Sequence, residues 1–343
     1  MSTSEDSQSL NIKSPGFHWT GILLRVFSWL LVSLTLLFLV NNYLIFWRGW
    51  PGLWNFFAHQ EWFGFSPLRT PLSDEKHMLG WIQTIILILI IILNLLYAIK
   101  TTKRGLIEDA RIFSIFAAYL TRSCFWAVFL VGVADFIISF MVVERLWEAI
   151  FSPEVKAFMV KSPERITFIH FPIILISFVI GYFTKSVGFI WLAVLVVVSE
   201  FIIVLSRFIF SYEQAFQGDL VRFWYAALYL FASAYALIHE GHARVDVLYS
   251  SFSERKKAWT NLLGSALLGV PLVLIVLFLG LNGKASIING PVVAFEVTQQ
   301  GSNGLYLLYL MAVYLAVFAV TMLLQFTSYF MGSSYKILNG KEN

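Results

Sequence analysis

Among the charged residues in apolar stretches that are long enough to cross a membrane, four are candidates for a functional role: Asp135, Glu200, Arg122 and Arg207. An ionisable group within a bilayer is costly, so such residues are functional candidates by default. Glu200 and Arg207 are two helical turns apart and therefore share a helix face. Two chemistries fit these residues. One is a buried ion pair, a snorkelling arginine or a subunit contact that fixes packing, and the other is a relay for a coupling ion or a proton.

A second group of polar residues, with the sequence HEGH at 239–242, looks at first like a metal site. A zinc protease motif needs two histidines four residues apart on one helix face, with a glutamate between them. Here His239 and His242 are three apart, and a glycine interrupts the helix end. We therefore expect a structural corner, in which Arg244 and Asp246 tie the helix end to the following polar link, rather than a metal site.

A third polar cluster lies in a short loop between two apolar stretches and consists of Glu213, Gln214, Asp219 and Arg222. Charges at the rim of an interface mainly steer a partner and set the salt dependence of binding. The cluster is therefore a candidate docking site for a soluble partner. The alternative is that these side chains only solvate a loop.

The elements that carry these residues follow from the composition. The chain has 343 residues, of which 59% are hydrophobic and 13% are charged, and its mean hydropathy is +0.76. A soluble fold of this length could not bury so much apolar surface. The single cysteine, Cys124, excludes an intrachain disulfide and a multi-cysteine metal cluster. The net charge of +4 forms no basic patch of the kind that binds nucleic acid.

Eight apolar stretches predict an all-α, polytopic membrane protein, because long runs without alternation satisfy their backbone hydrogen bonds in lipid as helices. Pro271 should kink the seventh stretch. Of the histidines, His170 alone lies inside a stretch, so we expect no haem, no other cofactor and no catalytic residue. The stretches are residues 21–47, 79–99, 121–143, 166–184, 187–210, 220–238, 262–281 and 305–331.

The basic residues predict the orientation of these stretches in the membrane. The densest clusters, at 100–111 and 255–257, fall on the same side as both termini if the number of spans is even. The positive-inside rule then places both termini in the cytoplasm. The aromatic segment 48–78 and the amphipathic segment 144–165 are expected along the outer surface. Residues 106–120 have helical spacing and are expected to form an interfacial helix leading into the third span.

A weak internal repeat is also present. Residues 126–138 align with residues 191–203 at a shift of 65, with seven of thirteen positions identical. Asp135 then falls on Glu200. Apolar spans also match one another by chance, so this repeat is one of two explanations for the alignment.

The last part of the chain is specific enough to resemble a known family. The relevant segments read VLSRFIF at 204–210, WYAALYLF at 224–231, AYALIHEGHARVDVLY at 234–249 and FSERKKAW at 252–259. This pattern is similar to the DctQ family, the small membrane subunit of tripartite ATP-independent periplasmic (TRAP) transporters. Ala243 stands where the family more commonly has Val or Ile. The resemblance covers about residues 187–335.

The resemblance implies a division of labour. A periplasmic binding protein, DctP-like, captures the solute, and a large membrane subunit, DctM-like, holds the solute and sodium sites. The small subunit braces the large one against the lipids of the inner membrane and helps to dock the binding protein. The usual cargo of the family is an organic acid. Sodium is expected in the large subunit and not in this chain.

The predicted organisation has a polar cytoplasmic tail at 1–18, a four-helix extension at 19–185, a DctQ-like four-helix domain at 186–335 and a tail at 336–343. The extension is either an addition found in a long branch of the family or a degenerate second copy. Two other functions stay open at this point. One is a self-sufficient carrier or channel that uses Asp135 and Glu200 as coupling acids, and the other is a membrane enzyme or redox subunit that uses the histidine-rich turn.

Overall fold

The structure is a computed structural model that describes residues 19–101, 104–184, 189–211, 214–238, 249–298 and 304–339. These residues are helical throughout their regular structure, and no strand occurs among them, which confirms the predicted all-α class. The longer helices are α1 (Trp19–Arg48), α3 (Asp74–Lys100), α4 (Leu106–Val143), α8 (Phe171–Phe183), α9 (Phe189–Phe210), α10 (Ala215–Ile238), α12 (Glu254–Leu263), α13 (Val270–Leu281) and α15 (Leu308–Asn339). The shorter helices are α2 (Gly52–His59), α5 (Trp147–Ile150), α6 (Pro153–Val160), α7 (Ser162–Arg165) and α14 (Asn289–Ala294).

Seven helical segments of the described chain are long and apolar enough to cross a membrane, which confirms a polytopic membrane protein. Each of them overlaps one of the eight stretches predicted from the sequence. The remaining stretch, 220–238, lies in α10, which is a helix but is not among the seven. The seven segments are Trp19–Arg48, Asp74–Lys100, Leu106–Val143, Ser162–Phe183, Ile190–Ile209, Glu254–Leu281 and Leu308–Asn339.

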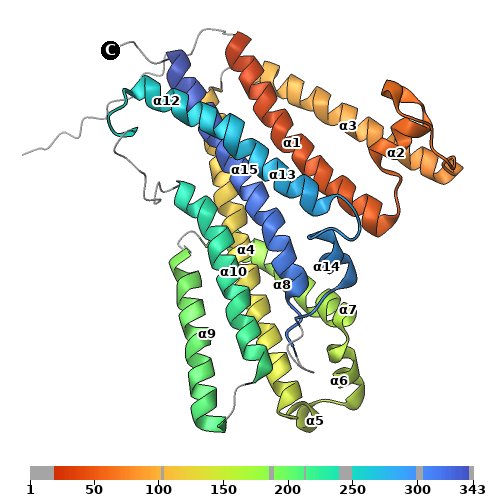
Figure 1. The fold of residues 1–343 in the computed structure, drawn as a ribbon, viewed down its shortest axis with the longest axis vertical. Coiled ribbons are helices and arrows are strands. Elements are labelled where there is room, and N and C mark those ends of the chain that lie inside the picture. Colours follow the sequence, from red (N-terminus) through yellow and green to blue (C-terminus); the bar gives the residue numbers. More distant parts are fainter. Residues whose placement is uncertain are drawn as a thin grey trace, which may run out of the picture.

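Helices α4 and α15 pack along each other at the centre of the molecule (Figure 1). On one side, α1 and α13 join them in a hydrophobic core that includes Val32, Phe113, Val273 and Leu324. Toward the other end, α9 and α10 join them in a second core around Phe223. Helices of the predicted extension and of the predicted DctQ-like part therefore interleave in both cores.

The segments expected at the membrane surface are partly different from the prediction. Residues 106–120 do not form a separate interfacial helix, because α4 continues through them without a break for 38 residues. At about 1.5 Å per residue this helix is roughly 57 Å long and extends well beyond a hydrocarbon core of about 30 Å. Segment 144–165 contains the short helices α5, α6 and α7. Segment 48–78 contains α2, whose buried Phe56 packs against Trp81 of α3.

Two prolines widen a helical turn instead of ending the helix. Pro172 and Pro271 each follow a π-helical segment, Ile166–His170 and Gly264–Gly269 respectively. Proline lacks an N–H group and its ring clashes with the carbonyl four residues earlier. A wider turn relieves that clash, and such π turns are frequent at functional sites. At Pro271, where we expected a kink, the structure has a π turn directly before the proline.

The contact between α4 and α8 depends on Gly181. A Cβ atom at this position would lie 2.5 Å from Ser123 Oγ and 2.8 Å from Ser123 Cα. Small residues of this kind let the backbones of membrane helices approach closely. Gly21 offers a comparison, because a Cβ atom there would meet nothing within 4 Å.

We expect Gly181→Ala to destabilise the protein by about 1–3 kcal/mol, because the methyl group overpacks a backbone contact. Gly21→Ala should be neutral or slightly stabilising, since alanine favours a helix by about 1 kcal/mol over glycine. Thermal unfolding of the purified protein in one detergent would measure both. Equal midpoints for the two variants would contradict the close α4–α8 contact.

Candidate functional site

Among the described residues, a buried polar cluster is centred on Asp135 of α4. It lies beside the segment that leads into the last span, α15. Oδ1 of Asp135 lies 2.6 Å from Nη2 of Arg165 and 3.0 Å from Nε2 of His170. Oδ2 accepts a hydrogen bond of 2.7 Å from the backbone N–H of Tyr306. Asp135 and His170 are fully buried and Arg165 is 1% exposed. Both carboxylate oxygens are therefore engaged within this chain.

The π turn Ile166–His170 explains how one helix supplies two donors to one carboxylate. In an α-helix, residues five apart point roughly 140° away from each other. A π turn accommodates one more residue, which brings Arg165 and His170 onto the same face. Arg165 then also reaches Ser139 Oγ at 3.0 Å and the backbone carbonyl of Asp135 at 2.7 Å.

Two tyrosines complete the cluster: Tyr309 of α15 and Tyr306, which lies just before that helix. The hydroxyl of Tyr309 lies 3.1 Å from Nδ1 of His170, and the two rings are nearly parallel. Because a carboxylate only accepts hydrogen bonds, Nε2 of His170 is the donor to Asp135, and Nδ1 forms the hydrogen bond with the Tyr309 hydroxyl. The guanidinium of Arg165 lies 4.3 Å from the centroid of the Tyr306 ring. A buried charge that is paired and hydrogen-bonded in this way is tolerated.

A second buried carboxylate holds the neighbouring backbone group. Asp219 of α10 is 1% exposed, and its Oδ2 accepts a hydrogen bond of 3.4 Å from the backbone N–H of Leu305. Asp135 and Asp219 thus bind consecutive N–H groups immediately before α15. We call Asp135, Arg165, His170 and Asp219 the clamp. It fixes the entry of the central helix α15 to α4, α10 and the turn before α8.

The structure places the predicted docking cluster only partly at the surface. Gln214 is 4% exposed and donates a hydrogen bond to Glu144, and Asp219 belongs to the clamp. Their side chains face other parts of this chain, so we assign them structural contacts. The side chain of Arg222 is 59% exposed and lies 3.9 Å from Asp219. Glu213 lies outside the described residues.

The other charged residues within spans differ in their surroundings. Glu200 is exposed on α9 and has no hydrogen-bond or ion-pair partner among the described residues. Arg207 is exposed near the end of the same helix, and Arg122 is half-buried in α4. His239, His242, Arg244 and Asp246 of the expected structural corner lie outside the described residues.

Sequence reasoning missed a second buried ion pair near the other end of α4. Nε of Arg25 lies 2.6 Å from Oδ2 of Asp109, and both side chains are almost completely buried. Arg25 also donates to the backbone carbonyl of Thr101 at 2.9 Å, and Trp29 Nε1 donates to Asp109 at 3.1 Å. These contacts join α1, α3 and α4. Arg25 lies in the apolar stretch 21–47 and Arg165 at the end of the surface segment 144–165, and neither is among the candidates that the sequence indicates.

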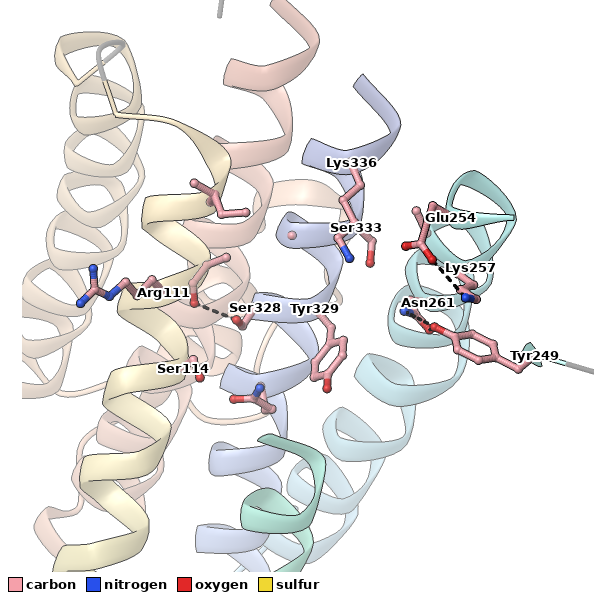
Figure 2. A pocket seen from close by; sticks show the side chains of 15 residues that line it. Arg111, Ser114, Tyr249, Glu254, Lys257, Asn261, Ser328, Tyr329, Ser333 and Lys336 are labelled. Atoms are coloured by element: carbon pink, nitrogen blue, oxygen red, sulfur yellow. Dashed lines mark hydrogen bonds and ion pairs between the residues drawn. The ribbon is translucent and has the colours of Figure 1, made fainter. Parts of the chain in front are cut away.

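A pocket of about 510 Å³ lies between α4, α12 and α15 (Figure 2). Lys257 pairs with Glu254 at 3.0 Å, and Asn261 bonds to Tyr249. The guanidinium of Arg111 points away from Ser328 (Figure 2). The lining residues are Ile107, Ala110, Arg111, Ser114, Tyr249, Glu254, Lys257, Ala258, Asn261, Gln325, Ser328, Tyr329, Gly332, Ser333 and Lys336.

Comparison with known proteins assigns a family to residues 194–333. Residues 194–333 match the family model described as tripartite ATP-independent periplasmic transporters, DctQ component. Residues 194–333 form a DctQ domain. No curated protein and no solved structure matches the chain.

The match confirms the family that the sequence resembled, and it begins within α9 and ends within α15. The DctQ family is a transport component of TRAP systems, and this match together with seven apolar helices supports a multi-pass protein of the inner membrane. The helices α1, α3, α4 and α8 lie outside the DctQ domain. The clamp joins the two parts, since Asp135, Arg165 and His170 precede the domain while Asp219, Leu305 and Tyr306 belong to it.

We expect Asp135→Asn to destabilise the protein by about 3–5 kcal/mol, because it leaves the charge of Arg165 buried and unpaired. Replacing both partners, as in Asp135→Leu with Arg165→Met, should cost less than the sum of the single changes. Thermal unfolding of the purified chain in detergent would measure these differences.

The exposed pair between Glu148 and Lys156 provides a control for Asp135→Asn. The hydrogen bond and charge of Lys156, 2.6 Å away, lower the pKa of Glu148, but the Glu148 side chain is 60% exposed. Exposed pairs contribute little to stability, so Glu148→Gln should leave the unfolding midpoint unchanged. An unchanged midpoint for Asp135→Asn as well would contradict the clamp.

Proposed function

We propose that this chain is the small permease subunit of a TRAP-type transporter that takes up an organic acid or a related solute by sodium-coupled secondary transport. Its partners would be a large DctM-like membrane subunit and a periplasmic DctP-like binding protein. The observation that carries the proposal is the DctQ domain at residues 194–333. The sodium and solute sites would reside in the large subunit.

The geometry supports a bracing role rather than a carrier role. A carrier acid must release its partners during the transport cycle, but Asp135 is bonded to Arg165, His170 and Tyr306 at once. The clamp and the Arg25–Asp109 pair hold α4 near both of its ends. A rigid subunit of this kind would give a moving large subunit a fixed support.

The orientation with both termini in the cytoplasm is part of this proposal. It puts the basic residues 255–257 on the cytoplasmic side and Arg222, near the start of α10, on the periplasmic side. The binding protein would then meet the exposed side chain of Arg222, whereas the buried Gln214 and Asp219 would support that surface from below.

A first test is uptake in proteoliposomes. We expect labelled organic acid to accumulate in the presence of a sodium gradient only when this chain, the large membrane subunit and the binding protein are all present. The large subunit should also co-purify with an affinity-tagged form of this chain. Transport by this chain alone would favour the self-sufficient carrier instead.

A second test addresses the binding protein. Arg222→Glu should raise the concentration of binding protein that gives half-maximal uptake, and high salt should reduce the difference, because rim charges act mainly on encounter. Lys284→Glu, an exposed charge in the segment between α13 and α14, serves as a matched control and should have a smaller effect. Equal effects of the two variants would remove Arg222 from the docking surface.

A further inference from the structure

Helix α9 has two faces of different character. The side that packs on α10 contains the buried residues Leu192, Ser199, Ile203 and Ser206. The opposite side is a stripe at helical spacing formed by Val197, Glu200, Phe201, Val204 and Phe208. Apart from Glu200 these are large apolar side chains, from 59% exposed at Phe201 to 89% exposed at Phe208. We call this surface the α9 stripe.

Glu200 lies at the middle of the span Ile190–Ile209. Ten residues of helix separate it from Ile190, which is about 15 Å, or half of a hydrocarbon core of roughly 30 Å. Neither lipid chains nor water can donate a hydrogen bond to a carboxyl group at this depth. Glu200 also has no partner among the described residues. Within the part of the chain that the structure describes, no donor faces Glu200, so a partner protein could supply one.

We propose that the α9 stripe is the surface against which the large membrane subunit packs, and that this partner places a cation or another hydrogen-bond donor opposite Glu200 at mid-membrane depth. The inference rests on the proposed function, because that function supplies a second membrane protein. Asp135, the acid of the apolar stretch 121–143, has an arginine and a histidine of its own. The large subunit would supply a hydrogen-bond donor to Glu200, as Arg165 of α7 and His170 of the π turn do for Asp135.

The charge of the α9 stripe argues against a second copy of this chain as the occupant. A two-fold interface centred on the stripe brings the same residues of both copies together. Two Glu200 carboxylates would then approach each other at low dielectric, and one of them would have to take up a proton. A partner with a donor at this depth removes that cost.

Photo-crosslinking tests the contact directly in the assembled complex. A photoreactive amino acid at Val197 or Val204, one turn on either side of Glu200, should crosslink to the large subunit. The same group at Leu175 of α8, which is 70% exposed, serves as the matched control and should not. Crosslinks between two copies of this chain from Val197 or Val204, or crosslinks to lipid alone, would overturn the proposal.

Charge reversal tests the role of Glu200 itself. Glu200→Lys should lower the amount of large subunit that co-purifies with this chain by at least about tenfold, because the lysine would face a cation, or a donor left without its acceptor, in a desolvated contact. Leu175→Lys places the same charge within another span and should leave co-purification unchanged. Glu200→Gln keeps an oxygen that can accept a hydrogen bond, so it should reduce the amount of co-purified large subunit less than Glu200→Lys does. The unfolding midpoint of each variant without the partner reports on its own folding.

The outcomes separate this inference from the proposed function. If the large subunit co-purifies with the wild type and with Glu200→Lys equally well, the α9 stripe is not its contact surface, although the function stands. If it does not co-purify even with the wild type, the proposed function itself fails and the inference with it.

Discussion

A carboxylate buried within a bilayer-spanning fold must obtain its hydrogen bonds from the protein, and much of this structure is arranged around that requirement at Asp135. Its donors come from three places in the chain: the end of α7, the π turn before α8, and the backbone just before α15. Each of these segments is positioned by being bonded to the same group. The π turn at Ile166–His170 is needed because a regular helix would direct only one of the two side chains toward Asp135.

The DctQ domain does not form a hydrophobic core of its own. Its last helix, α15, packs along α4, which lies outside the domain, and both hydrophobic cores contain residues of both helices. Near one end of α4, the pair between Arg25 and Asp109 binds α1 and α3. Near the other end, the clamp binds α8 and the entry of α15. Polar contacts at both ends therefore hold a helix that is otherwise fixed by non-directional apolar packing.

The sequence predicted the helical class, most of the spans and the family, because these follow from long apolar runs and from a continuous motif. It identified Asp135 as an unusual acid but not its partners. Arg165 lies next to the apolar stretch 166–184 and was assigned to a loop, since hydropathy cannot show that a charged side chain turns inward. His170 was noted only for its position in a span. The pairing of Asp109 with Arg25, 84 positions away, depends on tertiary contacts that no local pattern contains.

The predicted docking cluster also shows that sequence does not determine which polar side chains are buried, here for residues that were expected at the surface. Gln214, Asp219 and Arg222 are close in sequence and equally polar, yet only Arg222 has an exposed side chain. The difference arises from the segment before α15, which folds back onto α10 and covers Asp219. The sequence of a polar loop is thus equally polar whether its side chains are exposed to water or are buried and bonded to backbone groups. Only the return of a segment more than eighty residues later decides between the two.

The two acids that the weak repeat aligns have opposite surroundings: Asp135 is buried and paired, whereas Glu200 is exposed. Asp135 is surrounded because this part of α4 lies in the interior, where α4 packs against α8, α10 and α15 (Figure 1). Glu200 is exposed because α9 lies at the edge and packs mainly on α10 (Figure 1). Since an unpaired acid inside a span is costly on either helix, the chain satisfies Asp135 within its own fold. For Glu200, the proposed contact with a second membrane protein would supply the missing donor.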